Sequence, residues 1–175
     1  MINKYRPRII DGELSIRLKS IGAIVLEGAK WCGKSTTAEH HSNSAVFMDD
    51  PRRRSQYLIF AEDNPDLILN GETPRLIDEW QLAPIIWDAV RYTVDHRAGM
   101  GQFILTGSAK PANREKISHS GTGRFAWLRM RPMSLFESGD STGEISLSKL
   151  FKNPDMLIGC EAKSDLQRIS FLICR

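Results

Sequence analysis

Short apolar runs alternate with amphipathic segments along the first 130 residues of the chain. Apolar runs bounded by glycine, proline or acidic residues predict strands over residues 23–27, 45–48, 75–78 and 102–108, and the alternating run at 125–130 is a candidate fifth strand. Helical spacing of apolar residues predicts helices over residues 11–21, from 34 onward, over 55–63 and over 84–96, with a short turn between 64 and 71.

Strands that alternate with helices predict an α/β domain with a mainly parallel sheet. In the N-terminal helix, Leu14, Leu18 and Ile21 share one face, and Asp11 is the candidate cap. From Ser138 onward the sequence is polar and irregular, and its last twenty residues are weakly helical in pattern. We therefore expect a core over 1–137, including the short N-terminal helix, and an irregular or helical extension over 138–175.

Residues 28–35, here called the glycine loop, fit the pattern G-x-x-x-x-G-K-[ST] between a predicted strand and a predicted helix. Gly28 and Gly33 permit positive φ, so that successive backbone N–H groups can turn toward a phosphate. Lys34 supplies a charge for the β- and γ-phosphates, and Ser35 a hydroxyl for Mg²⁺. The residues expected to bind ATP are Gly28, Ala29, Lys30, Trp31, Cys32, Gly33, Lys34, Ser35 and Thr36.

An ordinary strand-to-helix turn is the alternative interpretation of the glycine loop. For the Trp31 side chain, packing beside the loop is preferred to contact with the nucleotide, and the Cys32 thiol is expected to be a spectator, so that these two residues would bind through the loop backbone.

The segment "RLIDEWQ" places two carboxylates at the carboxyl end of a predicted strand, where ligands bind in open α/β sheets. Asp78 is predicted to hold Mg²⁺ through water, together with Ser35. Glu79 is predicted to orient and polarise the attacking water as a catalytic base. An ordinary strand end is the alternative.

Further candidates for the same site follow other predicted strands. Thr106 and Ser108 are expected to bond the γ-phosphate or the water through a hydroxyl, unless the segment is a simple turn. Arg124 is a candidate arginine finger, with Arg129 and Arg131 close behind it, and a structural salt bridge is the alternative for Arg124. Asp49 and Asp50 end a predicted strand, and a simple turn is preferred there to a role in which they would contact the ligands of the metal.

Composition narrows the class of protein without naming a partner. The 175 residues carry 24 basic and 21 acidic side chains, a net charge of +3 that does not by itself indicate nucleic acid or an anionic membrane. The three cysteines, Cys32, Cys160 and Cys174, are odd in number and are expected to be free thiols in a reducing compartment. No apolar run approaches the roughly 20 residues that span a bilayer, and no signal peptide is recognised, so a cytoplasmic protein is expected.

Six segments together resemble one family in order, and the resemblance extends from about Tyr5 to the C-terminus. They are "YRPRIIDGEL", "GAKWCGKSTT", "PRLIDEWQLAPIIWDAVR", "GQFILTGSA", "HSGTGR" and "MRPMSLFESG". The chain is similar to AAA-type (ASCE P-loop) ATPases of the uncharacterised bacterial and archaeal "ATP-binding protein" group.

The resemblance implies a P-loop NTPase three-layer sandwich with a five-stranded sheet ordered 5-1-4-3-2. It also implies Lys34 and Ser35 as the phosphate and magnesium residues, Asp78 and Glu79 as the Walker B pair, Thr106–Ser108 as sensor, and Arg124 as finger. Members of the group usually continue into a winged-helix-like part and a nuclease-like domain, so residues 138–175 are expected to be the start of a truncated following region. DNA or a protein partner is suggested by family analogy only.

Three functions remain open from the sequence. A Mg²⁺-dependent ATPase that uses ATP and releases ADP fits Lys34, Ser35, Asp78 and Glu79. A nucleotide-binding switch or remnant without significant hydrolysis is the alternative. A small-molecule P-loop kinase is a weaker one, kept open by the arginines at 124–131. A GTPase is disfavoured, because no Asn-Lys-x-Asp element is present.

Overall fold

The computed structural model describes residues 5–107, 122–157 and 167. The chain divides into two compact units, Met1–Pro132 and Met133–Arg175. Every strand described belongs to the first unit.

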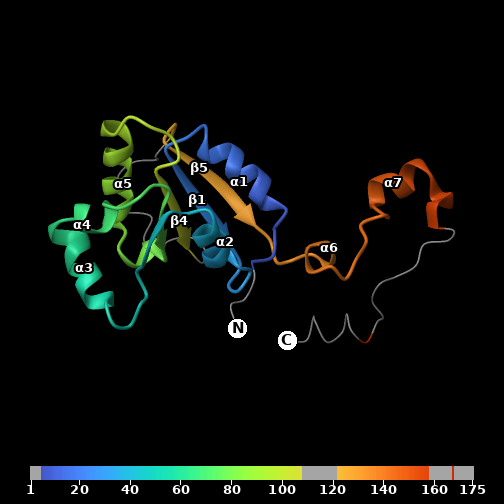
Figure 1. Cartoon of the computed structure of the whole chain (residues 1–175), viewed down its shortest axis with the longest axis horizontal. Helices are drawn as coiled ribbons and strands as arrows, with labels where there is room; N and C mark the ends of the chain where they lie inside the picture. The colour runs from blue at the N-terminus through green and yellow to red at the C-terminus, as the bar shows by residue number, and fades with distance from the viewer. Residues whose placement is uncertain (1–4, 108–121, 158–166, 168–175) are drawn as a thin grey trace. The chain divides into compact units, whose positions relative to one another are not determined.

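The first unit is built on one sheet of five parallel strands in the order β2-β3-β4-β1-β5 (Figure 1). Read from the other edge, this is the order 5-1-4-3-2 that the family resemblance implies. The strands are β1 (Ala23–Gly28), β2 (Ser44–Phe47), β3 (Arg75–Asp78), β4 (Phe103–Gly107) and β5 (Phe125–Met130). Because all five run in the same direction, their carboxyl ends meet at one edge.

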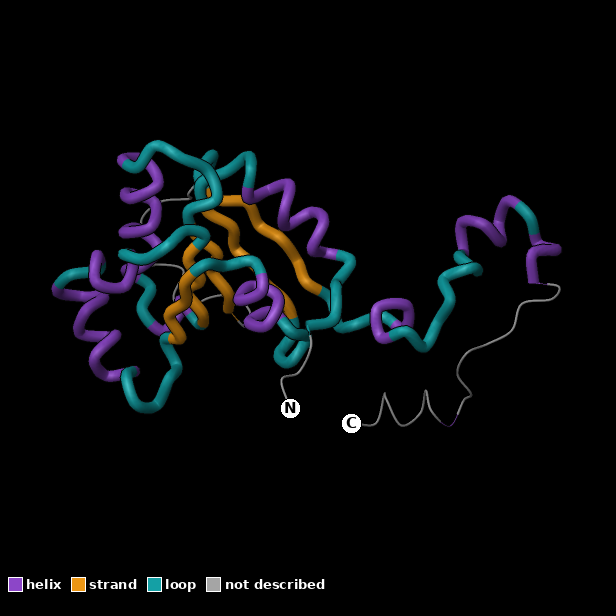
Figure 2. The backbone as a smooth tube through the Cα atoms, viewed as in Figure 1, coloured by secondary structure: helices purple, strands orange, loops and turns teal. Residues whose placement is uncertain are grey.

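Helices cover both faces of this sheet and make the expected three-layer α/β sandwich (Figure 2). One face packs against α1 (Ile10–Leu18) and α2 (Lys34–His40). The opposite face packs against α3 (Arg54–Asp63), α4 (Asp66–Leu69), the 3₁₀ turn η1 (Trp80–Leu82) and α5 (Ile85–His96).

Neighbouring residues of the inner strands face opposite layers, since side chains alternate along a strand. In β3, Leu76 packs toward α1 and α2 while Ile77 packs toward α5, and both are fully buried. Covering both faces explains why the inner strands are continuous apolar runs instead of alternating ones. Exposed positions occur only on the two outermost of these strands, at Ala45 of β2 and at Trp127 and Arg129 of β5.

The N-terminal helix differs in detail from the expectation. It begins at Ile10 and ends at Leu18, so Ile21 follows it as part of the turn into β1. Asp11 is not its N-cap but lies in its first turn, where its carboxylate accepts the backbone N–H of Arg8 at 2.7 Å. A carboxylate in a first turn still favours the helix, because it faces the unpaired N–H groups there.

The second unit contains short helices: α6 (Leu135–Ser138), α7 (Leu147–Lys152) and the 3₁₀ turn η3 (Pro154–Leu157). A capping box between Ser134 and Glu137 begins α6, and Gly139 in the left-handed conformation ends it. Most of the last twenty residues lie outside the described ranges. Across the part of the chain that the structure describes, no helix has the length and apolar content required to cross a membrane.

Candidate functional site

The glycine loop leaves the end of β1 and enters α2 at Lys34, in the sheet-to-helix position that its sequence predicts. Two of its residues have a left-handed backbone conformation: Trp31, with φ 65°, and Gly33, with φ 95°. A turn bond from the Cys32 N–H to the Ala29 carbonyl, 3.3 Å long, narrows the loop. Alternation of left- and right-handed residues lets backbone N–H groups converge into an anion-binding concavity.

Gly28 is required by a close approach of two strands. A Cβ built at this position would collide with the carbonyl oxygen of Met130 on β5 and would lie 3.0 Å from the Cys32 sulfur. The first glycine of the loop therefore allows β5 to lie against the loop's base, a reason that the sequence pattern does not reveal.

The Lys34 side chain folds back over the loop. Its ammonium donates to the carbonyls of Gly28 at 3.0 Å and Ala29 at 2.8 Å, and the residue is only 6% exposed. The structure thus brings a buried positive charge to the mouth of the loop, where the sequence predicts a phosphate.

Asp78, at the end of β3, gathers two hydroxyl groups from distant parts of the chain. One carboxylate oxygen accepts the Ser35 hydroxyl at 2.8 Å and also accepts the Thr106 hydroxyl. The parallel register explains the second contact, because Asp78 is paired with Thr106. Both residues are buried, and Thr106 is fully so.

This arrangement changes the expectation for Thr106. Its hydroxyl is directed at Asp78 and its side chain is inaccessible, so the structure does not place it to contact a phosphate or a water directly. Ser108, its expected companion, lies outside the described residues.

Glu79 follows Asp78 in a left-handed conformation, with φ 53°, and begins the turn η1. Non-glycine residues in this region are uncommon and cluster at functional sites. The carboxylate of Glu79 accepts a hydrogen bond from the side-chain amide of Gln81, which itself lies against Gly107 at the end of β4. Gln81 was not singled out from the sequence, although it stands in the quoted "RLIDEWQ"; only the turn at 79–82 brings its amide back to Glu79.

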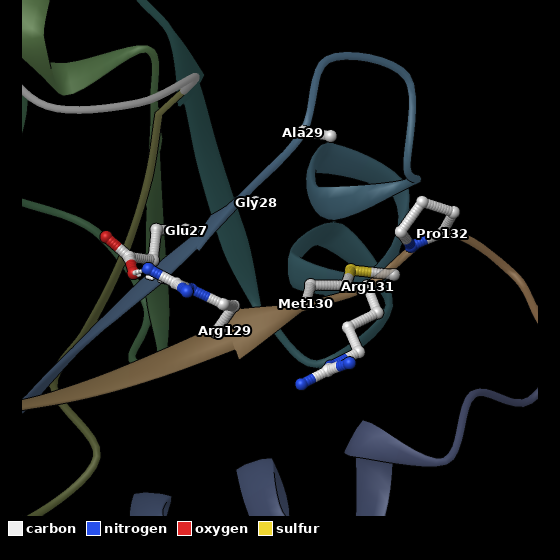
Figure 3. Close-up of a pocket in the computed structure, with 7 residues that line it drawn as sticks. All are labelled: Glu27, Gly28, Ala29, Arg129, Met130, Arg131 and Pro132. Carbon is white, nitrogen blue, oxygen red and sulfur yellow. Dashed lines mark hydrogen bonds and ion pairs between the residues drawn. The ribbon is translucent and has the colours of Figure 1, made fainter.

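A pocket of about 660 Å³ opens beside the start of the glycine loop (Figure 3). It is lined by Glu27, Gly28, Ala29, Arg129, Met130, Arg131 and Pro132. Arg129 reaches from β5 toward Glu27 on β1 and donates two hydrogen bonds of 3.2 Å to its carboxylate, as the close-up shows. Two of the three arginines from the 124–131 cluster therefore line a pocket that the glycine loop also lines.

Arg124 does not join them. It directly precedes Phe125, which is paired with Ala23 at the amino end of β1, so it lies at the sheet edge opposite the loop. Its guanidinium donates to Asp95 of α5 at 2.7 Å. This hydrogen bond lowers the pKa of the Asp95 carboxyl and raises the pKa of Arg124. Within one chain, Arg124 therefore lies away from the glycine loop, and its contact with Asp95 is the salt bridge that the sequence leaves open as the alternative.

Trp31 also differs from the preferred expectation. Its side chain is 90% exposed instead of packed beside the loop, and the Lys30 ammonium lies 5.5 Å from its ring centroid. Cys32, by contrast, is buried on the α1–α2 face of the sheet. Ala29, Lys30 and Thr36 are exposed at the loop and the start of α2.

Comparison with known families agrees with this geometry. A family model described as an AAA domain matches residues 20–138, more than half of the chain. The chain belongs to the AAA domain family. No protein of a curated reference set matches it significantly.

Membership makes residues 20–138 a nucleotide-binding, AAA-type ATPase domain, and it confirms the family that the six sequence segments indicate. The match begins just before β1 and ends in α6, so it contains the glycine loop, Asp78, Glu79 and Thr106. The N-terminal segment that contacts the loop, residues 5–11, precedes the match.

Proposed function

We propose that this AAA domain binds ATP with Mg²⁺ and hydrolyses its γ-phosphate. The observation that carries the proposal is the hydrogen bond between Ser35, at the end of the glycine loop, and Asp78, with Glu79 next in the chain. A phosphate-binding loop, an acidic metal partner and a second carboxylate available as a base are the parts that water-mediated phosphoryl transfer requires.

The residues present fit a magnesium ion. The Ser35 hydroxyl and the Asp78 carboxylate are hard oxygen donors, which Mg²⁺ prefers, and they lie within one hydrogen-bond length of each other. Ser35 would bind the ion directly and Asp78 through water. When bound, the ion would neutralise charge on the phosphates and so favour transfer.

Lys34 has a simple path to a bound nucleotide. Its ammonium is held by two carbonyls of its own loop, at 2.8 and 3.0 Å. A phosphate oxygen carries more negative charge than a carbonyl and forms a stronger charge-assisted bond with an ammonium. Lys34 would therefore exchange at least one loop carbonyl for the β- and γ-phosphates when ATP binds.

Glu79 would act as the base. As the water oxygen attacks the γ-phosphorus, the bond from that phosphorus to the β–γ bridging oxygen breaks, and the water proton passes to the Glu79 carboxylate. The products are ADP and inorganic phosphate. General-base assistance of this kind contributes on the order of 10²–10⁴-fold in rate.

Replacement of Glu79 by glutamine tests the proposal, because it keeps the shape of the side chain and removes the base. We expect Glu79→Gln to bind ATP as tightly as wild type and to release phosphate at least about 100-fold more slowly. Glu62→Gln, on the exposed surface of α3, is the matched control. Equal phosphate release by wild type and Glu79→Gln would overturn the assignment of Glu79.

A binding switch with little hydrolysis is the second candidate, and one contact favours it. The Gln81 amide donates a hydrogen bond to the Glu79 carboxylate, and this contact occupies the carboxylate oxygen that would otherwise face the attacking water. Tight ATP binding by wild type beside undetectable phosphate release would support this candidate. A gain of phosphate release in Gln81→Ala would then assign the restraint to this contact.

A further inference from the structure

Arg8 precedes α1 and is almost completely buried, at 7% exposure. Its guanidinium spans two segments that are remote from it in the sequence. One nitrogen donates to the Cys32 carbonyl in the glycine loop at 2.7 Å, and another donates to the Arg131 carbonyl after β5 at 2.9 Å. The Arg8 side chain therefore contacts both the glycine loop and Arg131, the residue after β5 that lines the pocket next to the loop.

The bond to Cys32 determines which way one peptide group of the loop faces. In a trans peptide the carbonyl and the following N–H point in opposite directions. Because the Cys32 carbonyl points at Arg8, the N–H of Gly33 points away from it. Gly33 has a left-handed φ of 95°, and a Cβ built there would lie 3.1 Å from the Arg8 guanidinium.

We propose that Arg8 is a positioning residue for nucleotide binding: it holds the outer carbonyl of the Cys32–Gly33 peptide so that the Gly33 N–H faces the phosphates. The inference rests on the proposed function for its ligand. Its structural part, the orientation of the loop, stands on the two hydrogen bonds alone. Arg8 touches no reacting atom, so its effect on the reaction is indirect.

An arginine suits this position better than another donor. A buried guanidinium is costly unless its N–H groups are paired. Its planar fork delivers donors in fixed directions, which allows one side chain to hold two carbonyls at once, whereas a lysine ammonium is a single flexible point. A lysine at this position is therefore expected to keep the charge and to lose one of the two contacts.

The backbone of Arg8 is itself anchored to the helix that follows the loop. Asp11 accepts the Arg8 N–H at 2.7 Å and the Tyr5 hydroxyl at 2.7 Å, and it lies 3.2 Å from the His41 imidazole that follows α2. The Tyr5 hydroxyl also lies 3.3 Å from the Thr37 hydroxyl in α2. These contacts hold segment 5–11 against α2. The backbone that carries the Arg8 guanidinium is therefore fixed relative to the loop.

Arg8→Met and Arg8→Lys test the proposal in the full chain, with Arg75→Met as the matched control. Arg75 is buried to a similar extent, at 8% exposure, and it also donates to a backbone carbonyl, that of Ile68 at 2.6 Å. It begins β3, and so lies at the amino edge of the sheet, opposite the loop. Both methionine variants lose a buried guanidinium, but only one loses a loop contact.

Two readouts separate the proposal from the proposed function. Calorimetry with MgATP and with MgADP should show dissociation constants raised about tenfold in Arg8→Met, raised less in Arg8→Lys, and within twofold of wild type in Arg75→Met. Amide hydrogen exchange of the nucleotide-free protein should be faster at Cys32 and Thr37, whose N–H groups are bonded to the loop carbonyls of Ala29 and Gly33, in Arg8→Met, and unchanged there in Arg75→Met.

The results that overturn the proposal are equally definite. Two results would contradict the proposal: a folded Arg8→Met protein that binds nucleotide as tightly as wild type, or an equal loss of nucleotide affinity in Arg75→Met. Either would mean that Arg8 contributes only to packing. If wild type itself binds no nucleotide, the proposed function fails, and the exchange rates at Cys32 and Thr37 still decide whether Arg8 orients the loop. Should Arg8→Met not fold, Arg8→Lys carries both measurements.

Discussion

Ser35 and Asp78 stand 43 positions apart in the sequence, and their side chains meet in a hydrogen bond of 2.8 Å. Strand β4, which lies next to β3 in the sheet, adds a second hydroxyl to this contact. Thr106 of β4 is paired with Asp78 in the parallel register and donates to the same carboxylate oxygen. Asp78 is only 5% exposed. The two hydroxyl donors therefore compensate much of the cost of burying a carboxylate.

Thr106→Val tests this compensation. Valine has the shape of threonine and no hydroxyl, so Asp78 would keep one of these two donors in a buried position. We expect a loss of about 1–3 kcal/mol in the free energy of unfolding, measured by urea denaturation. Thr106→Ser keeps the donor and should lose less. A larger loss in Thr106→Ser than in Thr106→Val would mean that the methyl group, not the hydroxyl, supplies the stability.

Gly28→Ala tests the close approach of β5 to the base of the loop. The added Cβ would collide with the backbone oxygen of Met130, which cannot move aside as a side chain can. We expect a destabilisation of about 1–3 kcal/mol, measured by urea denaturation, together with weaker nucleotide binding.

Gly12→Ala is the control for that substitution. Gly12 lies in α1, and a Cβ there meets nothing within 4 Å. Alanine is favoured over glycine in a helix, so this variant should gain about 0.5–1 kcal/mol. A Gly28→Ala protein as stable as Gly12→Ala would contradict the contact with Met130.

Arg124→Ala tests the placement of this arginine at the edge remote from the loop. In dilute protein, phosphate release should stay within twofold of wild type, because Arg124 contacts Asp95 and not the site. A loss that appears only at high protein concentration would assign Arg124 to the site of a neighbouring copy. A loss independent of concentration would contradict its placement.

The same variant has a predictable pH dependence. The pKa of Asp95 is lowered by its hydrogen bond to Arg124. A lowered folded-state pKa adds stability above the ordinary aspartate pKa of 3.8, and this stability is lost as the pH falls through the folded-state pKa. Wild type should therefore exceed Arg124→Ala in stability at neutral pH, and thermal unfolding should show the difference vanishing in acid.

Tyr5 provides a test at alkaline pH of how the N-terminal segment docks on α2. Burial raises the pKa of its hydroxyl from 10.0 to about 12. A raised folded-state pKa adds stability that is complete below pH 10 and is lost as the pH rises toward 12. Tyr5→Phe should therefore lose stability less steeply than wild type across this range in thermal unfolding, with exposed Tyr92→Phe as control. Identical slopes would place Tyr5 in water.

Much of the architecture follows from local patterns. The runs at 75–78 and 125–130 end where β3 and β5 end, since short apolar segments between turn residues have few other stable conformations. The glycine loop, Asp78 and Glu79 are predictable for the same reason: each lies at the end of a strand or directly after it, and parallel strands bring their carboxyl ends to one edge. The strand order came from the family resemblance and was confirmed by the sheet pairing.

Other features depend on contacts between segments far apart in the chain. Arg124 stands only five residues before Arg129 in the sequence. Because β5 extends between them, Arg124 lies at the amino end of the strands and Arg129 near their carboxyl end. Trp31 is apolar and was expected to pack, but its left-handed backbone turns it outward to 90% exposure. The sequence predicts that Thr106 bonds the γ-phosphate or the water, and the register of β3 with β4 adds Asp78 as a partner that the sequence does not indicate.

The order of residues is thus sufficient to identify the glycine loop, the two carboxylates Asp78 and Glu79, and the end of the sheet where they lie, because each is encoded within a few neighbouring positions. The partners of those groups are a property of the folded chain. Arg8 on the Cys32 carbonyl and Thr106 on the Asp78 carboxylate each join positions more than twenty residues apart. Such contacts depend on strand register and on the directions of individual side chains, which local periodicity does not specify.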